Sequence, residues 1–294
     1  MTSSIFIGSA VSYIYPLIFK NAQEEDEIKS TLFNTKIMLT ALSILGIFLV
    51  IFFVRSNPPQ PANFAEARRS RKNKSSLGSL LLLFRNANLI LIIVNIFVTA
   101  AVTTVLWVLL NQIFSKDFEE SATITTIAGL SYNVSAIVGC LVFPIVLDKT
   151  KRYRLLIFST YSIAFIFSLI FMAALWFKLP YLIYTSLFVF GACSFGQRVM
   201  MYDLIVEITY PFPEGTSIGI ITSLAYMFAA CFIPLLSWLI ELFSILYAIL
   251  LIETMLLIGF LPLFFISIKL LRNEAEQSNN SPTDEQCEKI EIKN

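Results

Sequence analysis

Long apolar runs separated by short polar stretches make up most of this chain. About 20 apolar residues in a helix are enough to cross the hydrocarbon core of a bilayer. Seven runs reach that length, near residues 33–54, 88–114, 122–147, 155–177, 181–208, 217–241 and 244–271. An eighth, residues 4–19, is shorter and contains Pro16, and we interpret it as a short spanning helix because it lacks the basic start of a cleaved leader. The pattern predicts an all-α, polytopic membrane protein with about eight helices.

Composition supports this prediction and excludes several functions. Hydrophobic residues make up 57% of the 294 residues and charged residues only 14%, which is far too apolar for a soluble domain. The chain has no histidine, and its four cysteines have no metal-ligand or disulfide spacing. We also find no nucleophile paired with a base and no phosphate-binding loop. We therefore expect no enzyme, no metal, no cofactor and, with 21 basic against 20 acidic residues, no nucleic-acid partner.

The positions of the charges predict the topology. The segment 55–87 carries seven basic residues against the single acid Glu66, so the positive-inside rule places it in the cytoplasm. The basic loop 148–154 falls on the same side if the helices alternate, whereas loops 23–29 and 115–121 on the other side are acidic. Both termini are then cytoplasmic.

Two segments outside the spans have a distinct character. Residues 77–84, within the basic linker, are apolar beside serine and arginine, and this fits either a short helix lying on the membrane surface or the start of the next spanning helix. The tail from residue 273 to 294 is polar and rich in glutamate, so we predict that it is disordered. The lipid bilayer is the partner that the spans themselves imply.

The stretch VEITYPFPEGTSIG, residues 206–219, ends one apolar helix and begins another. Pro211 and Pro213 break the first helix because proline lacks a backbone donor. Thr216 and Ser217 are candidate caps for the second helix. Glu214 just before them would place negative charge at the positive end of its dipole.

Asp203 and Glu207 lie four residues apart, on one face of the helix that enters this turn. They could pair with Lys149, Lys151 or Arg152 if the basic loop is their neighbour, and such pairs would form a latch at one gate of a transporter. Interfacial charges that face solvated headgroups are the alternative. Arg198 lies deeper in the same helix, and its expected partner is one of these carboxylates or a backbone carbonyl.

Other polar residues within the spans are candidates for a transport pathway. Ionisable groups in a membrane are costly and usually face a bundle interior or a water-filled path. Glu253 is the best candidate for proton coupling, with a buried neutral carboxyl as the alternative. Trp107 lies one turn before Asn111 and Gln112, so an aromatic face and amides could share one cavity wall, although simple packing gives the same spacing.

Three motifs carry a resemblance to a known family. They are LLNQI at residues 109–113, a segment from 139 to 154 that ends LDKTKRYR, and VEITYPFPEGTSIG at 206–219. In this order and spacing the chain resembles the major facilitator superfamily, and within it the feline leukaemia virus subgroup C receptor-related family. The resemblance covers residues 5–272 and places the eight helices at positions five to twelve of twelve. It implies that the first four helices are missing.

The resemblance divides the chain into four parts. Residues 1–54 would be the last two helices of the N-terminal bundle, and 55–87 the cytoplasmic linker between the two halves. Residues 88–272 would form a complete C-terminal six-helix bundle. The segment 273–294 would be the cytoplasmic tail.

The resemblance also implies roles for particular residues. Asp148 would approach the N-terminus of the first helix, near residues 3–4, while the basic residues after it would meet an acid such as Glu207. The implied cytoplasmic gate consists of Asp148, Lys149, Arg152, Asp203, Glu207 and Glu214. The implied substrate cavity contains Trp107, Asn111, Gln112 and Tyr226, the last in place of a family glutamine. Arg198 is a departure, since an apolar residue is expected there.

The family implies a transporter of a choline- or ethanolamine-like amine or cation that works by alternating access, at the plasma membrane rather than in endolysosomes. Haem and pyridoxine are other substrates that the family implies. The rival hypothesis is a truncated, non-transporting membrane protein or a partial gene model of a full-length carrier. In that case a partner chain could supply the missing helices.

Overall fold

The computed structural model describes residues 25–53, 87–118, 121–209 and 214–266. The predicted helix at 4–19, the surface helix at 77–84 and the tail from 273 lie outside these residues, as does almost all of the basic linker. The described residues contain no strand. The prediction of an all-α membrane protein is therefore confirmed.

Seven helices form in the described ranges, and each overlaps a predicted apolar run, although the first begins about eight residues before its run and the last ends about six residues before the end of its run. They are α3 (Glu25–Phe53), α6 (Ala87–Asp117), α7 (Ser121–Thr150), α8 (Tyr153–Trp176), α9 (Pro180–Thr209), α10 (Glu214–Leu242) and α11 (Ile245–Phe265). The joins within the bundle are only a few residues long. Consecutive helices must therefore run in opposite directions.

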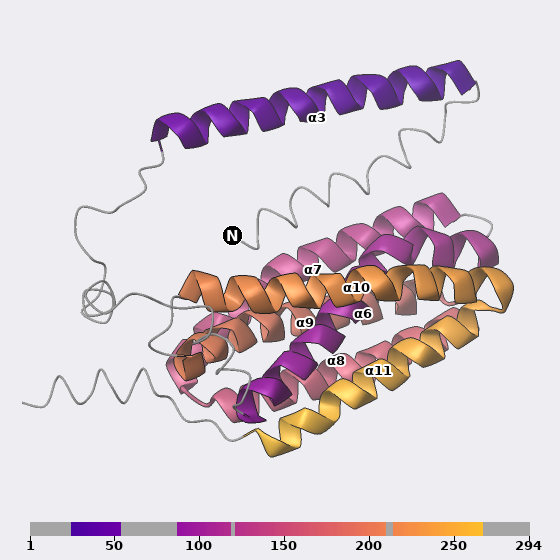
Figure 1. Ribbon diagram of the computed structural model, residues 1–294. Coiled ribbons are helices and arrows are strands. Elements are labelled where there is room, and N and C mark those ends of the chain that lie inside the picture. The colour runs from indigo at the N-terminus through magenta and orange to yellow at the C-terminus, as the bar shows by residue number, and fades with distance from the viewer. Residues whose placement is uncertain (1–24, 54–86, 119–120, 210–213, 267–294) are drawn as a thin grey trace, which may run out of the picture.

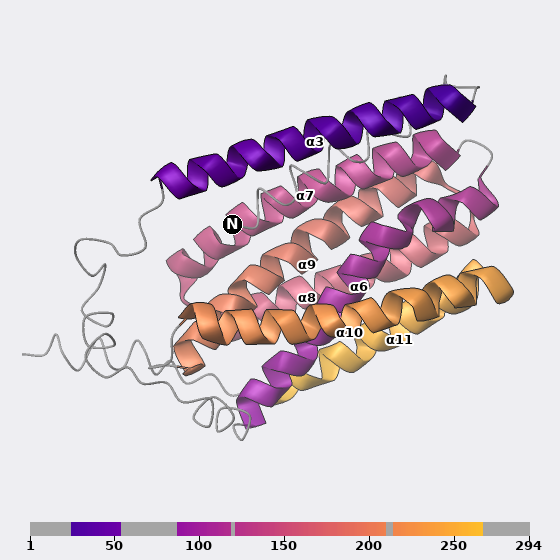
Figure 2. The same ribbon diagram turned by 45° about the horizontal axis from the view of Figure 1, so that its top comes forward.

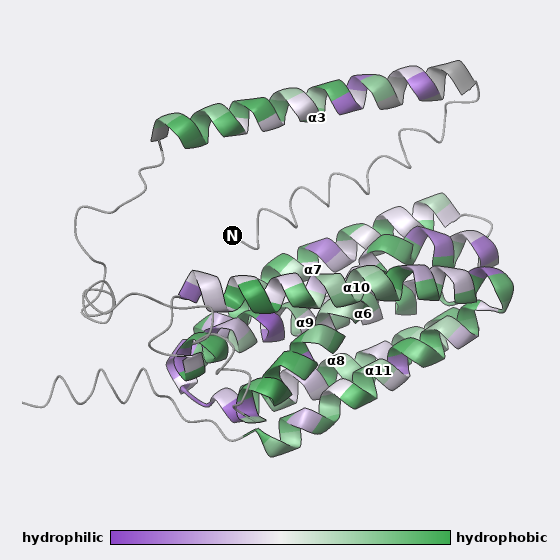
Figure 3. Cartoon of the chain, in the orientation of Figure 1, coloured by the Kyte–Doolittle hydropathy of each residue, from purple (hydrophilic) through white to green (hydrophobic). Residues whose placement is uncertain are grey.

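Helices α6 to α11 pack into one bundle, and α3 lies apart from it in both ribbon views (Figures 1 and 2). Within the bundle α6 runs between the pair α7 and α9 and the pair α10 and α11 (Figure 2). Hydrophilic residues gather mainly at the helix ends, whereas the long middle sections are hydrophobic (Figure 3). This distribution is the one a bilayer requires, with polar ends in water and apolar sides in hydrocarbon.

Six described helices are long and apolar enough to cross a membrane: α3, α6, α7, α8, α10 and α11. Helix α9, which we also predicted to span, has sufficient length but is not among them, because small and polar residues are spread along it. Ser194, Gln197 and Arg198 are all buried in the bundle. Helix α9 packs most closely on α7 and α8, and these neighbours shield its polar groups from hydrocarbon.

Glycines allow α7 and α9 to approach each other closely. A side chain on Gly139 would overlap the backbone of Ala192, and a Cβ on Gly196 would lie 2.8 Å from the carbonyl oxygen of Gly139. A Cβ on Gly191 would lie 2.8 Å from the ring of Tyr132. Small residues at such crossings let helix backbones make van der Waals contact in a membrane. This contact fixes α9, and with it the buried polar residues of the site.

Candidate functional site

An aromatic cluster around Phe195 joins three helices inside the bundle. The Phe195 ring, on α9, lies edge-on to Trp107 of α6 with centroids 6.2 Å apart, and 5.5 Å from the ring of Tyr132 on α7. Phe195 and Tyr132 are buried, and Trp107 is half-buried. The guanidinium carbon of Arg198, one turn further along α9, lies 5.1 Å from the centre of the Phe195 ring. Trp107, predicted for the substrate cavity, thus belongs to a cluster that also contains a positive charge.

Arg198 is held between α9 and α6 by hydrogen bonds to the chain of α6. Its Nη2 donates to the backbone oxygen of Thr99 at 3.1 Å and to the hydroxyl of Thr103. Only 8% of the residue is exposed. Of the two partners expected from sequence, the backbone carbonyl is the one observed. The tyrosine hydroxyl of Tyr132 also donates to the Thr103 backbone oxygen, at 3.3 Å, and brings α7 into the same contact.

A second polar link crosses the bundle beside the first. Gln197 donates through Nε2 to the side-chain oxygen of Asn95 at 3.0 Å, and Asn95 donates through Nδ2 to the backbone oxygen of Gly259 at 2.8 Å. These bonds connect α9 to α6 and α6 to α11. Buried amides without partners would cost several kcal/mol in hydrocarbon, so the link specifies how the three helices pack.

The other predicted cavity residues lie at different places. Gln112 accepts a hydrogen bond from the Ser237 hydroxyl at 3.0 Å and donates to the Glu241 carboxylate at 3.3 Å, so it joins α6 to α10 near the end of both helices. Asn111 is exposed on α6, and Tyr226 is 44% exposed on α10. The structure therefore brings Trp107 into the aromatic cluster, and it places Gln112 in an interhelical contact that sequence reasoning missed. The contact could have been suspected from the sequence, because Ser237 and Glu241 lie one helical turn apart in an otherwise apolar span.

The same α6–α10 contact includes a lysine. Lys116 donates through Nζ to the backbone oxygen of Ile240 and, at 3.4 Å, to that of Glu241. Both carbonyls belong to the last turn of α10, where the helix leaves its oxygens without backbone partners and carries partial negative charge. The lysine thus caps α10 from the neighbouring helix.

The predicted gate residues gather where α7 ends, α8 begins and α9 ends. Asp148 pairs with Lys151 at 3.6 Å, and both side chains are exposed. Lys149 and Arg152 are exposed as well. The helix-start partner predicted for Asp148 belongs to residues 3–4, outside the described ranges.

Asp203 has a partner that the sequence did not indicate. Its Oδ2 accepts a hydrogen bond of 2.9 Å from the Tyr153 hydroxyl, in the first turn of α8. The sequence predicts basic partners from the 148–154 loop, whereas the observed donor is a tyrosine at the start of the following helix. Glu207, one turn further along α9, is half-buried. The acidic end of α9 is thereby tied to α8.

One expectation for the turn at 206–219 is wrong. Helix α10 already begins at Glu214, so Thr216 and Ser217 lie inside its first turn and cannot cap it. The Ser217 hydroxyl is buried without a hydrogen-bond partner among the described residues. Glu214 itself is in the first turn, where its charge meets the positive end of the dipole. The helix thus starts two residues earlier than the predicted caps require.

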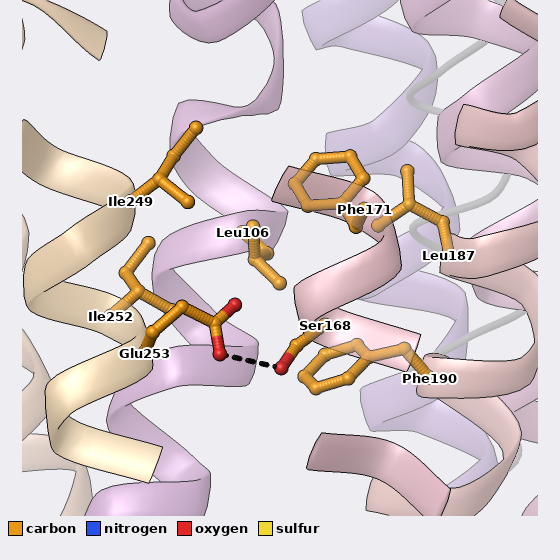
Figure 4. A pocket seen from close by; sticks show the side chains of 8 residues that line it. All are labelled: Leu106, Ser168, Phe171, Leu187, Phe190, Ile249, Ile252 and Glu253. Atoms are coloured by element: carbon orange, nitrogen blue, oxygen red, sulfur yellow. Dashed lines mark hydrogen bonds between the residues drawn. The ribbon is translucent and has the colours of Figure 1, made fainter. Parts of the chain in front are cut away.

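Glu253 faces a small cavity between α6, α8, α9 and α11 (Figure 4). The cavity is lined by Leu106, Ser168, Phe171, Leu187, Phe190, Ile249, Ile252 and Glu253. Glu253 is 8% exposed, and its Oε2 lies 2.9 Å from the Ser168 hydroxyl, which also lies 2.8 Å from the backbone oxygen of Phe165. A hydroxyl has one hydrogen and cannot donate to both oxygens at once. When it donates to Phe165, the Glu253 carboxyl must carry a proton in order to donate to Ser168.

The bundle of long apolar helices defines a polytopic membrane protein. The model of the Major Facilitator Superfamily matches residues 33–234, which is more than half of the chain. The protein belongs to this superfamily.

The relatives that the chain matches agree with the resemblance to the feline leukaemia virus subgroup C receptor-related family. The choline/ethanolamine transporter flvcr2a of Danio rerio is 26% identical over 282 residues, covering 95% of this chain and 60% of the relative. The choline/ethanolamine transporter FLVCR2 of Homo sapiens is 24% identical over 234 residues, covering 77% and 44%. The choline/ethanolamine transporter FLVCR1 of Mus musculus is 31% identical over 206 residues, covering 68% and 36%. The chain thus spans 36% to 60% of the length of these relatives.

Proposed function

We propose that the protein is a membrane transporter that moves a small organic amine or cation, of the choline or ethanolamine type, by alternating access. The observation that carries the proposal is the half-buried Trp107 within an aromatic cluster inside a membrane bundle of this superfamily. Aromatic faces attract alkylated ammonium groups, and the attraction grows when water is excluded. The similarity to choline/ethanolamine transporters supports the same substrate class. Haem and pyridoxine stay predicted as alternative substrates.

In this proposal, the acidic end of α9 and the loop after α7 form the inner gate. The gate residues are Asp148, Lys149, Arg152, Asp203, Glu207 and Glu214. The Tyr153–Asp203 bond supports the gate because it fixes an acidic side chain beside the basic loop. The gate would lie on the cytoplasmic side of a plasma membrane, with both termini in the cytoplasm. A partner chain that supplies further helices stays a prediction.

We further propose Glu253 as the group that couples transport to protons. It is a carboxyl deep within a span, and its hydrogen bond to Ser168 can be made with or without a proton on the carboxyl. Among the residues that the structure describes, no basic side chain lines its cavity. A carboxyl that gains or loses one proton and lies between helices that move during transport can make the arrangement of those helices depend on pH.

The experiment is uptake of labelled choline, ethanolamine and pyridoxine by proteoliposomes that contain the full chain. We expect uptake of choline or ethanolamine above that of empty liposomes. Trp107→Ala should reduce it at least about tenfold, as the loss of a desolvated cation–π contact of about 2 kcal/mol implies. Trp238→Ala is the matched control, since that tryptophan is exposed on α10 and should leave uptake unchanged. Absence of uptake for all three solutes would overturn the proposal.

A further inference from the structure

Arg198 is a permanent positive charge inside the bundle, and it has no acidic partner among the described residues. Asp148 instead pairs with Lys151, at the end of the bundle. Asp203, five residues further along α9, is exposed and accepts from Tyr153. Glu253 is held by Ser168 on α8. Arginine cannot lose its proton to escape the cost of burial. Its charge therefore needs compensation that the described residues do not supply.

Most of the guanidinium donors are unused. A guanidinium has five N–H donors, and the two observed hydrogen bonds both come from Nη2. Among the described residues, Nη1 has no acceptor, and the buried Nε has no hydrogen-bond partner there either. A buried donor without a partner costs about 1 to 3 kcal/mol. An oxyanion that accepts from these donors would remove that cost and also neutralise the charge.

The surroundings of Arg198 indicate which part of a ligand would lie there. The guanidinium carbon of Arg198 lies over the Phe195 ring, and Trp107 contacts the same ring from α6. The charge and the tryptophan therefore lie one aromatic ring apart. A purely cationic solute near Trp107 would be repelled by Arg198, since two like charges interact strongly where water is excluded. A solute with an acidic group beside its ammonium group would be attracted by both residues.

We propose that Arg198 binds an oxyanion of the transported solute, a carboxylate or a phosphate, so that the substrate is a zwitterion whose ammonium group lies at Trp107. Arginine suits this role because its planar fork matches the geometry of both oxyanions. The proposal rests on the proposed function and narrows its substrate class from amines to amines that carry an acid. Arg198 is then the residue that determines specificity.

The test uses three solutes that share one trimethylammonium group and differ in the acid. These are choline, with no acid; glycine betaine, with a carboxylate; and phosphocholine, with a phosphate. Each competes against uptake of the labelled solutes in proteoliposomes of the parent, Arg198→Gln and Arg198→Lys. Arg154→Gln is the matched control, because Arg154 is an exposed arginine that donates to the backbone oxygen of Phe264 at the bundle end. Melting temperatures of the purified proteins with each solute report binding separately from transport.

We expect one zwitterion to compete at least about tenfold better than choline in the parent and in Arg154→Gln, as a charge-assisted hydrogen bond implies. In Arg198→Gln this preference should disappear while choline uptake remains, and Arg198→Lys should retain part of it. Which zwitterion competes distinguishes a carboxylate from a phosphate ligand. Choline that competes as well as both zwitterions in the parent would overturn the inference. The inference would also be overturned if Arg198→Gln weakened competition by all three solutes equally, because this result indicates a purely structural role for Arg198.

The failure of this inference is distinguishable from failure of the proposed function. Uptake of choline without preference for a zwitterion overturns the inference alone. If no solute is taken up, the proposed function fails, and the melting temperatures then decide the inference. A zwitterion should stabilise the parent and not Arg198→Gln, and no difference between them would refute binding at Arg198. If Arg198→Gln fails to fold, the order in which the three solutes compete for uptake by the parent protein still tests the inference.

Discussion

Replacing Gly139 by alanine should destabilise the bundle by forcing α7 and α9 apart. The added methyl group would overlap the carbonyl oxygen of Ala192 and lie 2.7 Å and 2.8 Å from its carbonyl carbon and Cα. Ordinary van der Waals contact begins at 3.4 Å, so these two contacts are short by at least 0.6 Å. The obstructing atoms belong to a helix backbone. They cannot rotate away as a flexible side chain would.

The magnitude follows from what the two helices lose when they separate. A gap of 0.5 to 1 Å forfeits about a quarter to a half of the dispersion energy of each contact. This is the closest helix pair of the bundle, and Gly196 faces the Gly139 carbonyl oxygen in the same crossing. Overpacking of this kind costs about 1 to 3 kcal/mol. The better helix propensity of alanine returns about 1 kcal/mol at most, so the net effect is a loss.

The assay is the melting temperature of the detergent-purified protein, followed by the loss of its monodisperse chromatographic peak. Gly219→Ala is the matched control, because it is also a glycine within a helix and nothing lies within 4 Å of its added methyl group. It should be neutral or slightly stabilising. If Gly139→Ala melts at or above the temperature of Gly219→Ala, the account of the α7–α9 contact is wrong.

Three further predictions concern the polar groups. Uptake by Glu253→Gln should be independent of pH while that of the parent varies, and identical pH profiles would remove the coupling role. Tyr153→Phe should cost about 1 kcal/mol by the loss of its bond to Asp203, measured as a lower melting temperature. If Gln112 acts only through its hydrogen bond to Ser237 on α10, Ser237→Ala and Gln112→Ala should change the rate of uptake to the same extent. A raised KM in Gln112→Ala alone would instead indicate that Gln112 touches the solute.

Controls for these variants come from side chains of the same type outside the contacts. Tyr247→Phe removes a hydroxyl from an exposed tyrosine on α11 and should leave the melting temperature unchanged. Ser223→Ala removes an exposed α10 hydroxyl whose bond stays within its own helix, so uptake should be unaffected. Equal changes in the controls would indicate that the contacts described above contribute nothing specific.

The membrane class and the helix positions could be predicted from the sequence. The run at 122–147 became α7, Ser121–Thr150, and the run at 217–241 became α10, Glu214–Leu242. Helix length and apolar character are local properties that the bilayer imposes on each span separately. The assignment of the charged ends to sides of the membrane rests on equally local properties and stays a prediction. Each loop carries its own charges, and no distant contact alters them.

The partners of the buried polar groups were decided only by the tertiary structure. Arg198 bonds to Thr99 and Thr103, almost 100 positions earlier, and Gln112 bonds to Ser237, 125 positions later. These spans are apolar on nearly every side, so no amphipathic stripe shows which face turns inward or toward which helix. The sequence therefore identifies Arg198 as an arginine within a span. Only the packing of α9 against α6 and α7 shows that its charge lies beside Phe195, with donors left for a ligand.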